Sequence, residues 1–218
     1  NSNDPMYVGY KYGTSGSLEN NRLNTNDSTI KTTIDTWYKN NLTAYTKYLS
    51  NDAVYCNDRN LKSGGTYSTT KSFGYAPYER IYTNKQPTYN CTNMSDAFSV
   101  NNTSAKLDFP VSLMTADEIA FAGGAVYPKM STPYAWFISN SVGTQVSYVW
   151  WSLSPLSGGG SGSSVLDWNS GDASLYSHSV DFRLTVRPAI SLKSCIKYST
   201  GNGTYNEPYE ILETSSGC

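Results

Sequence analysis

The chain has 218 residues, of which 38% are hydrophobic and 15% are charged, and its formal net charge is −1. Its lysines are scattered singly, so it lacks the basic face that displaces counterions from phosphates, which excludes nucleic-acid binding. No apolar run approaches the roughly 20 residues that span a bilayer, so no transmembrane segment is predicted.

Residues 1–110 are predicted to form a half that combines one helix with long irregular loops. Tyrosines alternate with other residues near the N-terminus, which indicates a short edge strand followed by a loop. A helix is expected to begin at Asp27 or Ser28, because both are good N-caps and apolar residues recur at helical spacing over 30–42. Gly and Pro break any periodicity over 50–110, and long loops of this kind often carry function.

Residues 111–218 are predicted to form a half made mainly of antiparallel β-structure. A short helix should open at Thr115, which can form a capping box with Glu118. Gly123 and Gly124 should end that helix, because glycine readily adopts the left-handed conformation of a C-terminal stop.

The strands of this half are expected to pair through hairpins. They are predicted at 134–138, 146–153, 165–168, 173–176, 182–186 and 189–192. The Gly- and Ser-rich run over 157–164 is expected to be a flexible turn, and residues 169–172 carry a strong hairpin signal. The last two strands would form one strand bent around Pro188. Trp150 and Trp151 would point to opposite faces, so at least one belongs to the core.

Four cysteines, at Cys56, Cys91, Cys195 and Cys218, allow three disulfide pairings. We predict Cys56–Cys91 and Cys195–Cys218, because sequence neighbours close the shorter loops. No metal site is predicted, because there is no C-x-x-C pair and the lone His178 cannot complete a zinc cluster at the usual spacing. Four free buried thiols are the alternative. Disulfides would place the protein outside a reducing cytosol.

Six runs are spread in order over nearly the whole chain. They are IKTTIDTWYKNNL (30–42), VYCNDR (54–59), VSLMTADEIAFAGG (111–124), YVWWSLSP (148–155), VRPAISLK (186–193) and GNGTYNEPYEI (201–211). Together they resemble an uncharacterised family of secreted or surface domains in Gram-positive, often gut-dwelling, bacteria. Related sequences look like the C-type-lectin-like group that includes formylglycine-generating-enzyme-type variable proteins.

This resemblance implies a single α+β domain over 1–218, with two helices packed on a twisted antiparallel sheet and a ligand face built from long irregular loops. Some members follow a prepilin-type N-terminal helix, which would make the chain the head of a pilin. The chain begins at Asn1 rather than Met, so we expect that a signal or anchor was removed or that the sequence is an excised piece. The family brings no catalytic residues, and no cofactor is expected. The usual lectin calcium motifs are absent, although DWN (167–169) has similar residues in another order.

Catalytic patterns are weak in this sequence. A Ser-His-Asp triad would need His178, but the run over 159–163 lacks the final glycine of a nucleophile elbow. His178 is therefore expected on a surface loop. Several acids are candidates for a pair that hydrolyses glycosides, but their spacing selects none. These acids are Asp108, Asp117, Glu118, Asp167, Asp172 and Asp181.

The polar surface is rich in neutral Asn, Ser, Thr, Tyr and Gly, as in secreted adhesins and antibody paratopes. An AT-rich genome would produce the same enrichment without any function. We predict a non-enzymatic binding or adhesion domain, displayed outside the cell on a bacterial surface, whose partner is a host or bacterial surface glycan or protein. The candidate ligand-binding residues are Tyr134, Trp168, Asn169, Asp172, Tyr176 and His178.

Aromatic rings can stack on sugars while amide and carboxylate groups fix orientation. Ordinary hairpin packing is the alternative for each candidate, above all for Trp168. The main alternative function is the structural head of a type IV pilin-like or other surface filament, which would self-assemble. A hydrolase that uses His178 is a more distant alternative.

Overall fold

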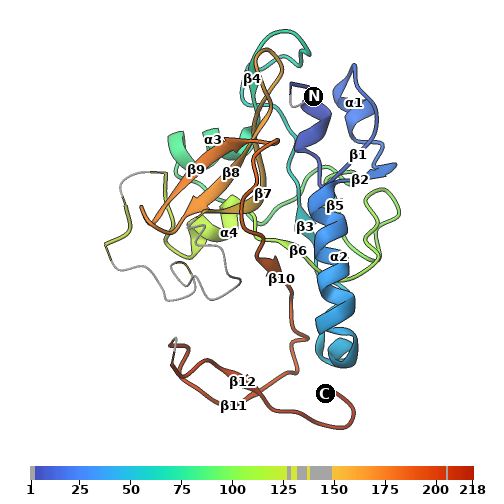
Figure 1. Ribbon diagram of the computed structural model, residues 1–218, viewed down its shortest axis with the longest axis vertical. Coiled ribbons are helices and arrows are strands. Elements are labelled where there is room, and N and C mark those ends of the chain that lie inside the picture. Colours follow the sequence, from blue (N-terminus) through green and yellow to red (C-terminus); the bar gives the residue numbers. More distant parts are fainter. Residues whose placement is uncertain (1–2, 127–128, 132–136, 138–148, 205) are drawn as a thin grey trace.

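Helix α2 (Thr29–Asn41) begins where the sequence predicts. The Ser28 hydroxyl caps it by accepting a hydrogen bond from the Lys31 N–H at 3.2 Å. Ile34 and Tyr38 are buried and turn toward the protein core, while α2 stands upright beside the rest of the molecule (Figure 1). The chain continues from it into the 3-10 helix η2 (Thr43–Tyr48).

This computed structural model describes residues 3–126, 129–131, 137, 149–204 and 206–218. The other helical segments are η1 (Pro5–Val8), α1 (Leu18–Asn21), α3 (Ala76–Tyr78), the π-helical turn η3 (Glu79–Thr83) and α4 (Ala116–Phe121). The strands are β1 (Lys11–Tyr12), β2 (Asn26–Asp27), β3 (Tyr55–Cys56), β4 (Phe73–Gly74), β5 (Ala97–Phe98), β6 (Ser112–Leu113), β7 (Val149–Gly158), β8 (Ser164–Asn169), β9 (Ser174–Ser179), β10 (Pro188–Ala189), β11 (Tyr198–Thr200) and β12 (Glu210–Ile211). The fold is therefore α+β with antiparallel sheets, as predicted.

The main sheet has four antiparallel strands in the order β4-β7-β8-β9. The predicted hairpin turn is confirmed, because Asn169 pairs with Ser174 across it. Strand β7 continues to Gly158, past the predicted end at 153, which shortens the expected flexible turn to 159–163. The predicted strand over 134–138 lies, apart from Phe137, outside the described residues.

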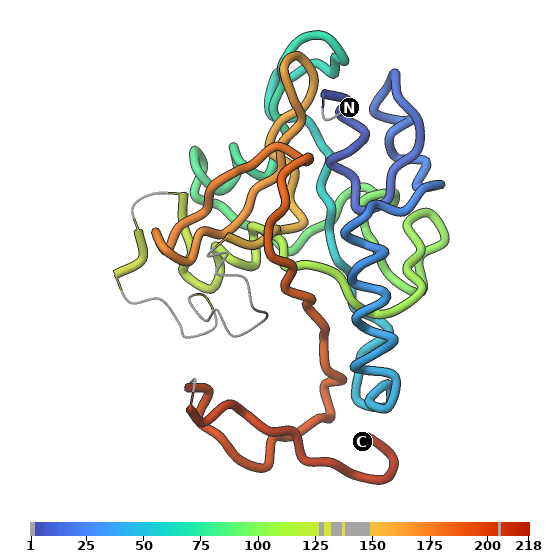
Figure 2. The backbone as a smooth tube through the Cα atoms, viewed as in Figure 1, coloured from blue at the N-terminus to red at the C-terminus, as the bar shows by residue number. Residues whose placement is uncertain are grey.

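The predicted bent strand over 182–192 is wrong. In this stretch, β10 pairs with β6, while Thr185 and Leu192 form isolated bridges to Trp150 and Leu49. Three residues before β10, the Thr185 N–H donates to the Val149 carbonyl, and the Thr185 carbonyl accepts from the Trp151 N–H, both at 3.1 Å. Thr185 therefore hydrogen-bonds to the edge of β7 that faces away from β8. The segment 180–186 therefore crosses from the edge strand β9 to the far side of β7, and Figure 2 shows the chain descending from there between the sheet and α2. We call 180–186 the crossing segment.

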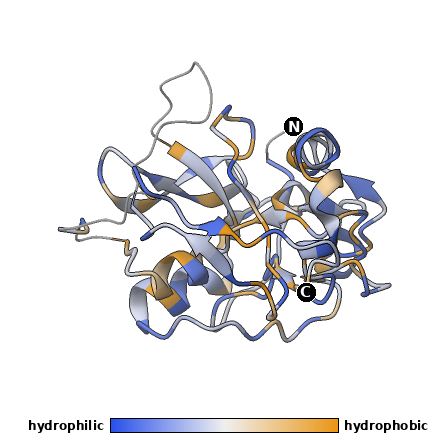
Figure 3. Ribbon diagram, turned by 90° about the horizontal axis from the view of Figure 1, so that it is seen from below, coloured by the Kyte–Doolittle hydropathy of each residue, from blue (hydrophilic) through white to orange (hydrophobic). Residues whose placement is uncertain are grey.

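The sheet separates two hydrophobic clusters. Trp151 and Val165 belong to the cluster that also holds Ile34 of α2, whereas Trp150 and Trp168 belong to the cluster on the opposite face. The two adjacent tryptophans point to opposite faces, as alternation along β7 requires, and both are buried because each face is covered by a cluster. Figure 3 shows hydrophobic residues (orange) in the middle of the view and a largely hydrophilic periphery.

Helix α4 packs against the second of these clusters through the buried Ile119. Its predicted capping box is present: the Thr115 hydroxyl accepts from the Glu118 N–H at 3.1 Å, and the Glu118 carboxylate accepts from the Thr115 N–H at 2.7 Å. Gly123 follows with a φ of 91°, the left-handed conformation expected for the stop.

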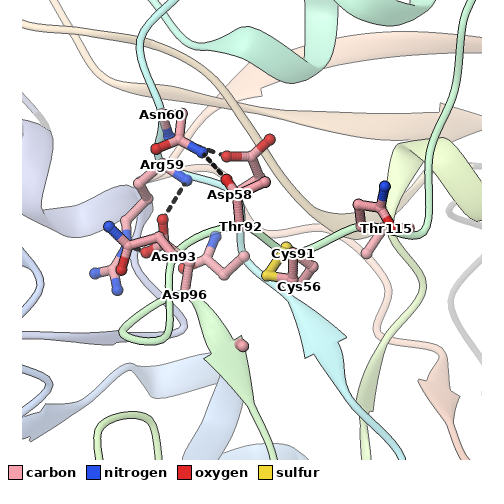
Figure 4. The surroundings of a disulfide bond; sticks show 12 residues. Cys56, Asp58, Arg59, Asn60, Cys91, Thr92, Asn93, Asp96 and Thr115 are labelled. Atoms are coloured by element: carbon pink, nitrogen blue, oxygen red, sulfur yellow. Dashed lines mark hydrogen bonds and ion pairs between the residues drawn. A yellow bond between two sulfur atoms is a disulfide. The ribbon is translucent and has the colours of Figure 1, made fainter.

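The Cys56–Cys91 disulfide is formed as predicted, and a buried ion pair lies beside it (Figure 4). Arg59 is only 1% exposed, and its Nε donates to Asp96 Oδ1 at 2.7 Å. Its Nη1 donates to the Lys11 carbonyl at 3.1 Å. This guanidinium therefore fixes β1 to the loop that follows β3.

The C-terminal arm, residues 190–204 and 206–218, lies below the sheet in the view of Figure 1, which shows its hairpin of β11 and β12 there. The predicted Cys195–Cys218 disulfide closes the arm. The Tyr48 hydroxyl holds it near η2, donating to the Thr214 carbonyl and accepting from the Thr214 N–H, each at 3.0 Å. None of the helices in the described ranges is long and apolar enough to cross a membrane.

Candidate functional site

A cavity of about 480 Å³ lies between the N-terminal segment with the start of α2 and the sheet face that carries Trp151. Tyr7 and Tyr12 come from the N-terminal segment, and Ile30 comes from α2. The sheet contributes Trp151 and Val165, and the crossing segment forms a further wall.

The tyrosine wall is positioned by close backbone packing. A Cβ at Gly9 would lie 2.4 Å from the Lys11 carbonyl oxygen and 2.9 Å from Arg59 Nη1, so only glycine fits this approach. The rings of Tyr7 and Tyr12 then meet edge to face, with centroids 5.3 Å apart. Both rings are half-buried, so each offers part of its surface to the cavity.

The crossing segment supplies the most exposed part of the lining. The Phe182 side chain is 57% exposed and borders the cavity. Asp181 and Arg183 flank it and are also exposed. The lining thus combines aromatic and aliphatic surface with one acidic and one basic side chain, so it suits a ligand with little net charge.

His178 lies on β9 rather than on the surface loop that the sequence suggested. Its Nδ1 is 2.7 Å from Asp167 Oδ2. Asp167 is fully buried and its Oδ1 has no hydrogen-bond partner among the described residues. Burial raises the pKa of Asp167 to about 6, although the contact with His178 acts in the opposite direction.

This pair does not line the cavity but lies on the same sheet face, because the lining residue Val165 lies opposite His178 in the sheet and the ring of Phe182, another lining residue, is centred 5.1 Å from the imidazole. A buried carboxylate that orients an imidazole is two-thirds of a hydrolytic triad. In the described part of the chain, however, no serine hydroxyl is hydrogen-bonded to His178. Among the described residues, the imidazole is oriented by a carboxylate but meets no hydroxyl nucleophile.

The six predicted ligand-binding residues do not form one contact surface. Trp168 is fully buried: its ring stacks on Phe137 at 4.4 Å and its Nε1 donates to the Phe137 carbonyl at 3.0 Å. It therefore packs in the core and does not reach a ligand. Tyr134 lies outside the described residues.

The other four predicted residues are half-buried. Asn169 and Asp172 make the turn, where the Asn169 side chain accepts from the Asp172 N–H at 3.2 Å. Asp172 also pairs with Lys129 at 2.7 Å. Tyr176 lies opposite Asp167, and His178 two residues further along β9, so both share the sheet face that borders the cavity.

A cluster of three aspartates could be mistaken for a metal site. Asp27, Asp35 and Asp108 offer carboxylate oxygens within 4.8 Å of one another. The buried Lys31 Nζ lies among them, at 3.1, 2.5 and 2.8 Å respectively. The ammonium group thus occupies the position that a cation would take.

Sequence reasoning did not identify the cavity residues as functional. The sequence pattern places Tyr7 and Tyr12 on an edge strand and predicts a strand at Phe182. No local signal reports that these side chains meet across a cavity, because the crossing segment brings them together through long-range contacts. Comparison with family models, curated proteins and solved structures gives no match to this chain.

Proposed function

We propose that this chain is a non-enzymatic extracellular binding module whose ligand enters the cavity between α2 and the sheet. The partner is a host or bacterial surface glycan or protein. The proposal includes the bacterial-surface location and the C-type-lectin-like kinship implied by the sequence resemblance. The contact face proposed here is the cavity rather than the hairpin of β8 and β9, because Trp168 in that hairpin is buried.

The observation that carries this proposal is the cavity of about 480 Å³ with its aromatic lining. Ligand pockets are typically about 300–1,000 Å³ in volume and are mostly apolar, with a few polar groups that fix orientation. Tyr7, Tyr12 and Phe182 supply ring surface, while Asp181 and Arg183 supply polar groups. Two disulfides support an oxidising location outside the cytosol.

A binding screen against glycan arrays and cell surfaces tests the proposal, with Phe182→Ala and Tyr12→Ala beside the parent protein. We expect each variant to lose about tenfold or more in affinity, because removing a ring from a binding pocket removes its stacking contact. Tyr198→Ala is the matched control, since Tyr198 is 65% exposed on the C-terminal arm and does not line the cavity. Equal binding by all four proteins, or binding by none of them, would refute the proposal.

The filament alternative is favoured by one observation on the C-terminal arm. Tyr198, Tyr209 and Leu212 are all exposed there, and the two tyrosine rings lie 4.9 Å apart. Exposed aromatic pairs of this kind suit a contact with another copy of the chain. Sedimentation velocity over a range of concentrations tests this: self-association that Tyr198→Ala abolishes would favour the filament role, and a monomer at every concentration would exclude it.

A further inference from the structure

The aromatic cavity continues into a second hollow along α2. This hollow is a shallow depression open to solvent, and it is lined by Asp27, Thr29, Thr32, Thr33 and Thr36. Thr29 and Thr33 line both spaces, so the two hollows adjoin. From Thr29 to Thr36 the helix rises by about 10 Å, which leaves room for a ligand longer than the cavity alone would hold.

Three of the four threonines present acceptor atoms to this hollow. The Thr32, Thr33 and Thr36 hydroxyls donate to the carbonyls of Ser28, Thr29 and Thr32, at 3.2, 2.9 and 2.8 Å respectively. Each hydroxyl proton is therefore engaged within the helix, and the exposed oxygen keeps its lone pairs for an incoming donor. These three hydroxyls thus favour a ligand that offers donor groups.

The charged side chains around the hollow determine which ligand charge it favours. Asp27 closes one end, and its carboxylate is bound to Lys11 at 2.8 Å and to Lys31 at 3.1 Å. Asp108, which pairs with the same Lys31, keeps 61% of its side chain exposed. Three aspartates (Asp27, Asp35 and Asp108) share two lysines (Lys11 and Lys31), which leaves one negative charge at this end of the hollow and disfavours an anionic ligand.

A sugar chain matches this combination better than a peptide does. Sugar hydroxyls offer donors along the whole chain, and the apolar faces of sugar rings stack on aromatic side chains. An extended peptide alternates donors and acceptors, so half of its backbone polar groups would find no partner on a row of acceptors. The threonine methyl groups, fixed by the bonded hydroxyls, can pack against the ring edges.

We propose that the ligand is a neutral oligosaccharide chain, held by one sugar ring in the aromatic cavity and by the following units along the threonines of α2. This rests on the proposed binding function and adds the ligand class and its direction across the surface. The cavity binds the terminal or most apolar sugar unit, and the α2 threonines accept hydrogen bonds from the units that follow it. Affinity therefore depends on chain length.

The test uses ladders of glucose, mannose and N-acetylglucosamine oligomers of one to six units, titrated by calorimetry. Oligogalacturonate ladders serve as the anionic counterpart. The variants are Thr32→Val and Thr36→Val, singly and together, because valine keeps the branched shape while removing the acceptor. Thr43→Val is the matched control, since the Thr43 hydroxyl makes the same kind of bond, to the Lys39 carbonyl at 3.2 Å, and lies outside both hollows.

We expect the affinity for one neutral ladder to rise about tenfold between the shortest and the longer oligomers, the gain expected from one or two hydrogen bonds. The Thr32→Val/Thr36→Val double variant should lose that gain and bind the shortest oligomer as the parent does. Phe182→Ala should weaken every length alike, and Thr43→Val should change nothing.

Failure of this inference is distinguishable from failure of the proposed function. Binding that depends on Phe182 but is indifferent to chain length and to the threonines overturns the extended site and leaves the cavity as the binding site. Binding of the anionic ladder alone, or of no neutral ladder while a protein ligand binds in the cell-surface screen, overturns the glycan class. No binding in either screen removes both proposals.

Discussion

Replacing Asp167 by asparagine tests the electrostatics of the face that borders the cavity. The carboxyl is fully buried, one oxygen contacts His178 at 2.7 Å, and the other has no partner among the described residues. Asparagine has nearly the same shape and carries no charge, so the substitution removes the ionisation and preserves the packing. Its side-chain amide can still bond the imidazole.

The magnitude follows from the pKa. Burial raises the pKa of Asp167 from its ordinary 3.8 to about 6 in the folded protein. A raised carboxyl pKa makes a contribution to stability that is fully present below pH 3.8 and is lost as the pH rises through about 6, because the unfolded chain ionises first. At 1.36 kcal/mol per unit, the parent protein loses about 3 kcal/mol over this window.

The assay is urea denaturation of the parent and of Asp167→Asn at intervals between about pH 3.5 and pH 7.5. The free energy of unfolding of Asp167→Asn should gain about 3 kcal/mol relative to the parent across that range. Asp172→Asn is the control on the same hairpin: Lys129 lowers the pKa of Asp172, so the pH trend should have the opposite sign. A difference between parent and Asp167→Asn that stays constant with pH would refute the reasoning.

Three further outcomes are expected from equilibrium unfolding. Asp96→Ala should cost about 3–5 kcal/mol, because it leaves the buried Arg59 guanidinium without its carboxylate; a cost below 1 kcal/mol would contradict this. The Cys56→Ser/Cys91→Ser double variant should lose about 4 kcal/mol, as loop-closure entropy predicts for a separation of 35 residues. Thr115→Ala should cost about 1 kcal/mol through loss of the N-cap, and an unchanged denaturation midpoint would show that the cap is dispensable.

The elements that the sequence predicted correctly are those whose signals are local. Ser28 and Thr115 are good N-caps placed directly before apolar residues at helical spacing, so both helix starts could be read from a few neighbouring positions. The hairpin around residues 169–172 likewise depends on turn chemistry within four residues. The disulfide pairing followed from the lengths of the closed loops.

The contact between Asp167 and His178 could also have been derived. Once Asn169 pairs with Ser174 across the predicted turn, antiparallel register sets Asp167 opposite Tyr176. His178, two residues further along β9, then shares the face of Asp167 and lies diagonal to it, within reach of a side-chain contact. The predicted strand ends at Tyr176, so it leaves His178 in a loop and does not bring it diagonal to Asp167.

The crossing segment could not be derived from the sequence. Residues 182–186 have the β-branched and apolar composition of a strand, and strand propensity reports little beyond fit to a half-buried surface. Where the chain goes is decided by backbone partners on β7 that are more than 30 residues earlier, as the Thr185 bonds to Val149 and Trp151 show. The burial of Arg59 is equally non-local, since its partner Asp96 is 37 residues away.

The floor and the walls of the candidate site differ in how much they contribute to the stability of the fold. Trp151 and Val165, on the cavity floor, are 9% exposed and belong to the core, so changing them alters the stability of the sheet together with any binding. Phe182, on the cavity wall, and Thr32, in the adjoining hollow, are both exposed to solvent. Substitutions that retune the ligand without unfolding the protein are therefore confined to the walls. Under the proposed binding function, the crossing segment and the outer face of α2 would set specificity, and the sheet would supply the fixed floor between them.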